Sequence, residues 1–387
     1  MKRIQSIDFA RGAVMVIMAL DHVRDLMHIN SVTQSPTNLT TTTPLLFLTR
    51  FITYFCAPTF VFLAGTSAFL SFTRKNDISY SRNYLISRGI VLIIIELTIV
   101  NFGMFFDLGF HTYIFEVIAT IGFGFIMLGL MINLPPMTVG IIGLVIIFCH
   151  NLFPLIPFNN GSTIKLAVSQ FFLPGAIPIS ANRVFIMAYP PIPWLGIMLA
   201  GFAAGKLFTV AALKRRKIFL GVGLSALLLF VVLRFINIYG DPSVWSPQKN
   251  FVYTCLSFIN VTKYPPSLLF CLITLGVLFL VFAFIKQSDN KLISTISVYG
   301  KVPMFYFLVH FYLIHILMIM MLLLQGFHWA DFDFASGNFG RPKNLQSGIG
   351  LWKVYVIWVL VVIILYKPCL WYWKYKSTHK NWWLKYL

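Results

Sequence analysis

The chain has 387 residues, of which 58% are hydrophobic and only 11% are charged. Soluble globular proteins are about 45–50% apolar and ~25% charged, so this composition excludes a soluble enzyme. The formal net charge of +19 would suggest nucleic acid in a soluble protein. Apolar runs of ~20 residues instead indicate a membrane protein, in which the excess of Lys and Arg lies in loops beside the bilayer. We therefore expect a lipid bilayer as partner and no nucleic acid. The five cysteines form neither a disulfide framework nor a metal spacing.

Ten apolar segments follow one another along the chain, each long enough to cross a hydrocarbon core of ~30 Å. They lie at about 7–29, 43–72, 85–106, 113–133, 136–154, 184–208, 217–239, 265–285, 292–324 and 350–373. The first is expected to stay as a helix rather than be cleaved as a signal peptide, because Asp8 and Arg11 interrupt its apolar run. The pattern predicts an all-α polytopic membrane protein of about ten transmembrane helices, forming one domain over residues 1–387.

The charge of the loops predicts the orientation. With both termini in the cytoplasm, Lys and Arg favour the inner side by about two to one, as the positive-inside rule requires. Four long segments, at about 30–42, 155–183, 240–264 and 325–349, then lie outside. Because loops on a rigid scaffold often carry binding work, we expect the acceptor side to be outside.

The first apolar segment concentrates ionisable side chains at membrane depth, where each costs ~2.5–3.5 kcal/mol and usually faces a wet cavity. Arg11 and His22 are eleven positions apart, which returns them to within ~20° of one helix face, ~16 Å apart along the axis. Asp25 lies three residues from His22, and a carboxylate beside a histidine raises its basicity, as a general base needs. A plainer alternative is that Asp8 with Arg11, and Asp21 with Arg24, are ion pairs that serve helix packing alone.

Further blocks accompany the Arg11-to-His22 spacing along the chain. They are Ser6-Ile7-Asp8, the Asp21-His22-Val23-Arg24-Asp25 run, residues 48–52 with 56–58 and 60–67, Tyr189-Pro190 with Pro193-Trp194, Lys263-Tyr264-Pro265-Pro266-Ser267, and Gly300-Lys301-Val302-Pro303 with His310. Together they resemble the transmembrane acyltransferase superfamily, and within it bacterial relatives of the heparan-alpha-glucosaminide N-acetyltransferase catalytic domain. The resemblance extends over essentially the whole chain.

The resemblance implies that acetyl or another short acyl group passes from cytosolic acyl-CoA to an amino or hydroxyl group of a sugar or glycan outside. Acyl-CoA is then the donor substrate, no metal is expected, and the location is a bacterial inner membrane. The essential histidine of the lysosomal relative lies further toward the lumen than His22, so His28 remains an alternative base. Whether the acyl group stops on a histidine, and whether the protein is a homo-oligomer, stay open.

Acyl transfer needs a base, a stabiliser of the thioester oxyanion and cations for the phosphates of CoA. We assign catalysis to one group of residues, namely His22, Asp25, Arg11, Asp21 and His28. A second group is assigned to substrate, namely Arg24, Arg50, Lys263 and His310. A third is assigned to the donor, namely Lys301, Arg74 and Lys75. Two assignments have alternatives, since Arg50 could pair with Glu116 and the basic loop residues could reflect topology alone.

Other functions also fit parts of this pattern. A transporter or flippase for a glycan intermediate would account for charges inside the membrane and for broken helices. That class predicts an inverted repeat between the two halves, and the sequence contains no evident one. A non-enzymatic partner subunit is a third hypothesis.

Overall fold

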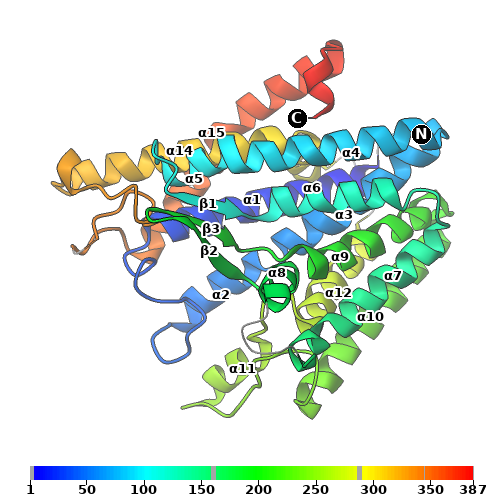
Figure 1. The fold of residues 1–387 in the computed structure, drawn as a ribbon, viewed down its shortest axis with the longest axis horizontal. Helices are drawn as coiled ribbons and strands as arrows, with labels where there is room; N and C mark the ends of the chain where they lie inside the picture. The colour runs from blue at the N-terminus through cyan, green and yellow to red at the C-terminus, as the bar shows by residue number, and fades with distance from the viewer. Residues whose placement is uncertain (1–3, 158–162, 286–289, 344, 387) are drawn as a thin grey trace.

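The computed structural model describes residues 4–157, 163–285, 290–343 and 345–386. Its long elements are helices (Figure 1): α1 (Gln5–Met27), α2 (Pro44–Thr53), α3 (Cys56–Lys75), α4 (Ile78–Ile95), α5 (Asn101–Phe105), α6 (Val117–Leu130), α7 (Pro136–Cys149), α8 (Thr163–Phe172), α9 (Pro191–Ala204), α10 (Ala212–Ile236), α11 (Phe251–Ile259), α12 (Leu268–Phe284), α13 (Lys291–Lys301), α14 (Pro303–Leu324) and α15 (Leu351–Thr378). Shorter 3-10 and π-helical turns are η1 (Glu96–Val100), η2 (His150–Leu155), η3 (Gly205–Thr209), η4 (Trp329–Asp331) and η5 (Trp382–Lys385), and the strands are β1 (Thr112–Phe115), β2 (Gly175–Ser180) and β3 (Arg183–Met187).

Within the described part of the chain, seven helical segments are long and apolar enough to cross a membrane. They are Pro44–Lys75, Ile78–Phe105, Pro136–Leu155, Pro191–Thr209, Ala212–Ile236, Pro303–Leu324 and Leu351–Thr378. The apolar helices α6 and α12 are shorter, and α1 carries five charged side chains. The prediction of a mostly helical, multi-pass membrane protein is confirmed, whereas the count of ten spans and the cytoplasmic termini stay predictions.

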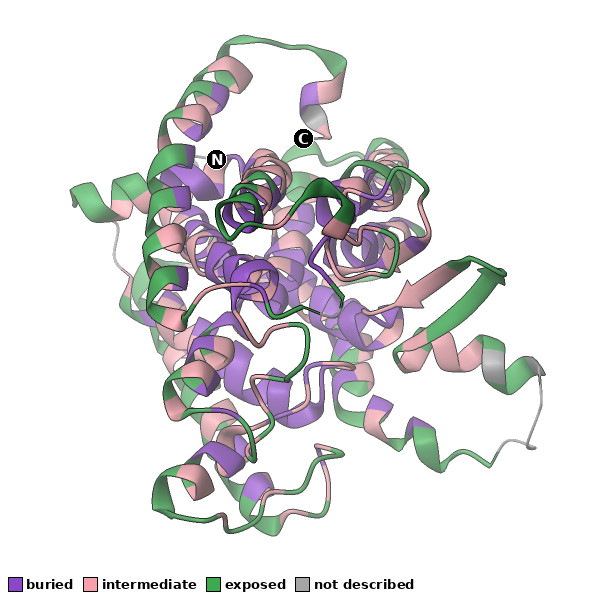
Figure 2. Cartoon of the chain, turned by 90° about the vertical axis from the view of Figure 1, so that its left-hand side faces the viewer, coloured by how far each residue is buried: buried purple, intermediate pink, exposed green. Residues whose placement is uncertain are grey.

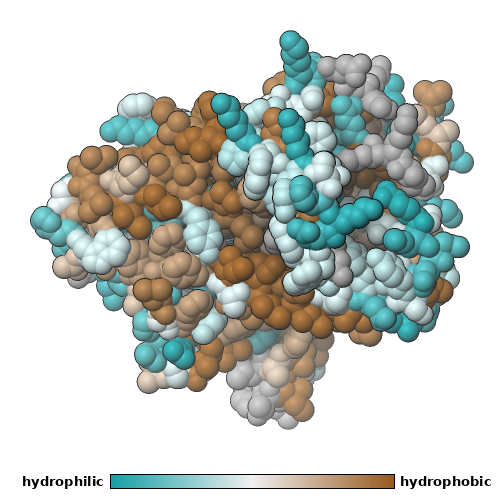
Figure 3. Space-filling model, turned by 90° about the horizontal axis from the view of Figure 1, so that it is seen from above, coloured by the Kyte–Doolittle hydropathy of each residue, from teal (hydrophilic) through white to brown (hydrophobic). Residues whose placement is uncertain are grey.

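Helices α4, α6 and α14 run side by side along the long axis of the view, and α7, α10 and α15 are inclined to them (Figure 1). The start of α1 and the turn between α3 and α4 lie at one end, and the long loops lie at the other. We call these the inner end and the outer end, after the predicted orientation. Figure 2 looks onto the outer end, where exposed loops and the strands surround buried helices. Figure 3 shows an apolar surface over much of one long side, with hydrophilic side chains gathered toward the inner end. This distribution is that of a protein embedded in lipid.

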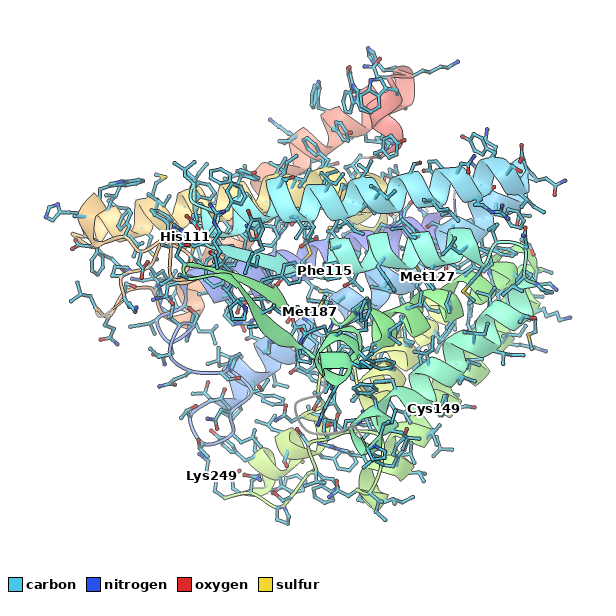
Figure 4. All side chains as sticks on the ribbon, viewed as in Figure 1. His111, Phe115, Met127, Cys149, Met187 and Lys249 are labelled. Carbon is cyan, nitrogen blue, oxygen red and sulfur yellow. The ribbon has the colours of Figure 1, made fainter. Side chains whose placement is uncertain are left out.

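The outer end contains a small sheet, which corrects the expectation of an all-α protein. β1 pairs in parallel with β3, and β2 pairs antiparallel with β3. Figure 4 labels His111 and Phe115 around β1 and Met187 at the end of β3, next to the start of α6, and Phe115 is the register partner of Met187. Asn101 holds β1 to α5, since its side chain bonds the carbonyl of Thr112 and the backbone N–H of Ile114.

Five predicted segments are not continuous helices. The 113–133 and 184–208 segments begin with the strands β1 and β3, before α6 and α9, and three others are broken within their length. The 43–72 segment divides at Tyr54–Phe55 into α2 and α3, and the 85–106 segment passes through η1 between α4 and α5. The 292–324 segment divides at Val302, because the residue before a proline is disfavoured in helical conformation. Irregular backbone at membrane depth is tolerated where protein surrounds it or where it lines a cavity.

Glycines allow α1 and α13 to approach closely. A Cβ added at Gly300 would collide with the carbonyl oxygen of Asp8 and would lie 2.7 Å from the backbone nitrogen of Gly12. These obstacles are backbone atoms, which cannot move aside as a flexible side chain can. The contact places Arg11 next to Lys301 at the inner end of the bundle.

We predict that Gly300→Val destabilises the protein by on the order of 1–3 kcal/mol, the cost of overpacking a tight contact. Thermal unfolding of the purified protein in detergent measures the change. Gly221→Val is the matched control, because Gly221 is also helical and a Cβ there meets no atom within 4 Å. Equal thermal stability of the two variants would contradict the tight contact between α1 and α13.

Candidate active site

Three adjoining cavities extend from the inner end of the bundle to the outer end. The inner cavity has a volume of about 280 Å³, the middle cavity about 110 Å³ and the outer cavity about 380 Å³. The inner and middle cavities share Phe60, Val117 and Phe307 as lining residues. The middle and outer cavities share four others, namely Asp25, Arg50, Lys263 and Tyr264. The shared walls make a path along which two substrates could meet from opposite sides.

His22 lines the middle cavity and is partly exposed to it. Its ring lies against Phe311, with centroids 4.2 Å apart, and against His310, with centroids 5.1 Å apart. In the described part of the chain, the ring nitrogens of His22 hydrogen-bond no residue. A histidine that lines a cavity and is held there by ring contacts is able to exchange a proton with a bound substrate.

Asp21 is the centre of an ion cluster between α1 and α2. Its carboxylate accepts hydrogen bonds from Arg24 NH2 at 2.5 Å, from Arg50 NH1 at 2.7 and 2.8 Å, and from Thr53 Oγ1 at 2.8 Å. Both Asp21 and Arg24 are buried. Arg50 therefore pairs with Asp21 and not with Glu116, which was its alternative partner. The cluster also favours the packing interpretation of the pair between Asp21 and Arg24.

The expected hydrogen bond between Asp25 and His22 does not form. Asp25 Oδ1 instead accepts a bond of 2.6 Å from Arg24 NH2, because the guanidinium lies between this carboxylate and Asp21. Asp25 still lines the middle and outer cavities. Its geometry fits neutralisation of Arg24 and a place at the boundary of these two cavities, rather than orientation of the imidazole.

Lys263 lies in an aromatic cage at the boundary between the middle and outer cavities. Its ammonium nitrogen is 5.0 Å from the ring centroid of Tyr264, 5.9 Å from that of Tyr189 and 6.0 Å from that of Tyr54. The hydroxyl groups of Tyr189 and Tyr264 are 3.4 Å apart. The aromatic faces attract the ammonium group. Lys263 thus lies beside the cavity of His22.

His310 is fully buried and does not line any of the three cavities. Its Nδ1 donates to the backbone carbonyls of Phe307 at 2.6 Å and Tyr306 at 3.1 Å, in the tautomer that leaves Nε2 without a proton. Nε2 has no hydrogen-bond partner in the described part of the chain. His310 was expected to bind substrate, but it packs behind His22 and suits a positioning role. His315, on another face of α14, stacks on Phe106.

His28, the alternative base, lies just beyond α1 and does not line the middle cavity. Its Nδ1 accepts a bond from the backbone N–H of Asn30 at 3.3 Å. Its ring lines a separate small cavity with Arg24 and Asp25. The geometry therefore favours His22 over His28.

The inner cavity collects cations from several helices. Arg11 donates to Ser67 Oγ at 2.9 Å and to the carbonyl of Gly300 at 3.2 Å, and it also contacts Asp8 at 3.9 Å. The cationic residues lining this cavity are Arg11, Arg88, Lys301 and Lys376. Arg11 and His22 thus line consecutive cavities, as their shared helix face predicts.

Arg74 and Lys75, which were expected to bind the donor, are exposed at the end of α3. Lys75 Nζ lies 4.9 Å from the ring centroid of Tyr80. Neither residue lines the inner cavity. Their position fits the alternative interpretation, in which basic loop residues set the topology.

Several residues of the site were not assigned a role from the sequence. They are Thr53, Tyr54, Arg88, Glu116, Tyr189, Tyr264 and Lys376. Tyr189 and Tyr264 each precede a proline in two of the sequence blocks that resemble the acyltransferase superfamily. Their place in these blocks is the signal that could have identified them. Glu96, by contrast, lies outside the three cavities and accepts a bond from the backbone N–H of Ala119, at the start of α6.

We predict that Asp21→Asn costs ~3–5 kcal/mol of stability, because it leaves two guanidinium groups at membrane depth without their shared counter-charge. Asp25→Asn is the matched control and should cost only ~0–1 kcal/mol, since its side chain is 40% exposed and, among the described residues, it forms an ion pair with Arg24 alone. Thermal unfolding and the monodisperse yield in detergent measure both variants. A larger loss of stability for Asp25→Asn than for Asp21→Asn would show that Asp25, and not Asp21, is the centre of the cluster.

The family model described as the catalytic domain of heparan-alpha-glucosaminide N-acetyltransferase matches residues 3–237. The matched range is more than half of the chain and includes His22, the Asp21 cluster and Arg11. A comparison with curated proteins found no match. The family resemblance seen in the sequence is confirmed: the chain belongs to the family of the heparan-alpha-glucosaminide N-acetyltransferase catalytic domain.

Proposed function

We propose that the protein is a membrane-bound acyltransferase that moves an acetyl or other short acyl group from cytosolic acyl-CoA to an amino or hydroxyl group of a sugar or glycan on the outer side of a bacterial inner membrane. The position of His22 is the observation that carries this proposal. His22 lines the middle one of three adjoining cavities. This cavity lies between an inner cavity rich in cations and an outer cavity lined by long loops.

The inner cavity suits acyl-CoA. CoA carries three phosphate groups, which Arg and Lys side chains bind by charge-assisted hydrogen bonds. Its pantetheine arm is long and narrow, and the wall of Phe60, Val117 and Phe307 leads from the cations to His22. The small volume of the middle cavity favours a short acyl group at the end of that arm.

The outer cavity suits a polar acceptor. It combines loop residues such as Ser35 and Asn260 with the charged groups Asp25 and Lys263. Hydroxyl, amide and carboxylate groups of this kind hydrogen-bond a sugar. The acceptor's reactive atom would reach the middle cavity past Lys263, whose charge is held in place by its aromatic cage.

The reaction is a direct acyl transfer. His22 takes a proton from the acceptor as its oxygen or nitrogen attacks the thioester carbonyl carbon, and the carbonyl electron pair moves to oxygen. Lys263 and Arg50 line the same cavity and supply positive charge for the oxyanion. The carbonyl re-forms as the carbon–sulfur bond breaks, and the imidazolium returns its proton to the thiolate. The products are the acylated acceptor and free CoA.

We predict that His22→Gln lowers acyl transfer by ~10²–10⁴-fold, the usual contribution of a general base. Folding should persist, because the ring lies at a cavity wall and the amide keeps a polar group there. His28→Gln is the matched control and should keep near-normal transfer. The assay measures release of CoA thiol and labelled product with purified protein and a panel of amino sugars and glycans.

The opposite pattern, with transfer lost in His28→Gln and kept in His22→Gln, would show that the base is His28 and not His22. Movement of an acceptor across the membrane with no acyl transfer from any acyl-CoA would instead support the transporter or flippase hypothesis.

The sidedness of the reaction gives a second prediction. In sealed vesicles of known orientation, labelled acetyl-CoA supplied at the inner face should label an acceptor supplied at the outer face. The expectation follows from the cations of the inner cavity and the loops of the outer cavity. Vesicles that accept acetyl-CoA only from the outer face would reverse the orientation, and product confined to the inner face would contradict transfer through the bundle.

A further inference from the structure

The inner cavity is completed by the last part of the chain. Lys376, in the final turn of α15, and Tyr386, after η5, both line this cavity. Both lie far along the sequence from Arg11 and Arg88, which line the same cavity. Figure 1 shows the end of α15 leaving the bundle and the chain then turning back toward it. We call residues 379–386 the return segment.

Specific contacts hold the return segment against α15. The Asn381 side chain donates to the Tyr375 hydroxyl at 3.1 Å. The Tyr375 ring stacks on His379, with centroids 4.0 Å apart, and lies 6.3 Å from the ring of Trp383. Leu384 is buried. The segment therefore has a defined path, which places Tyr386 at the cavity.

α15 is also tied to the recognised block that contains Lys301. The ammonium nitrogen of Lys301 lies 3.7 Å from the ring centroid of Trp373. Trp373 and Lys376 are three residues apart, so they lie on neighbouring positions of one helix face. Two lysines from different helices thus converge on the cavity beside aromatic rings. This combination matches a phosphorylated nucleotide, because cations bind phosphate and aromatic faces stack on bases.

We propose that the end of α15 and the return segment bind the nucleotide part of the donor, an adenosine carrying phosphates at the 3′ and 5′ positions, with Lys376 on a phosphate and Tyr386 beside the adenine. This inference rests on the proposed function, because it names the part of the chain that binds the donor at that site. The segment lies beyond residues 3–237, the range that the family model matches, so the match does not supply this assignment.

Direct binding of CoA to the purified full chain in detergent, measured by calorimetry, tests the proposal. Lys376→Ala and Tyr386→Ala should each weaken CoA binding by about tenfold, the scale expected for one charged or stacking contact. The same loss should appear with adenosine 3′,5′-bisphosphate as the probe. Lys374→Ala is the matched control, because Lys374 is on the same helix but is exposed and does not line the cavity. Lys376→Arg should retain most of the affinity.

The outcomes separate this inference from the function on which it rests. A wild-type chain that binds CoA with an affinity unchanged by Lys376→Ala and Tyr386→Ala overturns the role of the return segment and leaves the acyltransferase proposal standing. A wild-type chain that binds no CoA overturns both. Thermal unfolding of each variant checks the fold, and deletion of residues 379–387 with unchanged CoA affinity would also overturn the inference.

Discussion

The arrangement of the site depends on one carboxylate at membrane depth. Asp21 holds Arg24 from its own helix and Arg50 from α2, and it also accepts a bond from Thr53 at the end of α2. Unpaired, each of these charges would be costly in lipid. Paired, they fix how α2 sits against α1 and how α1 is rotated. The next residue is His22, so the same rotation that buries Asp21 between the helices turns the imidazole toward the middle cavity.

Breaks in the helices leave space for the cavities that lie beside this ion cluster. α2 ends at Thr53 and α3 begins at Cys56, so Tyr54 leaves the regular helix and joins the cage of Lys263. A break at Val302 lets α13 lie against α1 while α14 continues behind His22. Continuous helices would fill these spaces with packed side chains. The cavities therefore exist where the backbone departs from regularity, and the surrounding protein bonds the polar groups that are released.

Much of the fold was predictable, because hydrophobic runs of membrane length leave few alternatives to a helix. For the same reason β3 was predicted as part of a helix, because its residues are apolar. Their branched and aromatic side chains also suit a strand. Within the site, the position of Arg11 and His22 on one face of α1 follows from helical periodicity alone. The partner of Asp25 did not follow, because Arg24 can reach both Asp21 and Asp25, and only tertiary packing decides which side chain each carboxylate contacts. The position of Lys376 in the inner cavity could not be predicted, because a basic residue near a helix end is expected from topology alone.

Contacts at the outer end hold His28 outside the middle cavity, even though it lies near His22 in the sequence. Arg341 is buried and donates to the carbonyl of His28, to Ser31 Oγ and to Ser347. Burial lowers the pKa of Arg341 to about 10, so it remains a cation at neutral pH and keeps these bonds. They hold Arg341 and Ser347 against the end of α1, and Phe339, two residues before Arg341, lies in the wall of the middle cavity. His28 belongs to this set of contacts, whereas His22 lines the cavity that Phe339 helps to enclose.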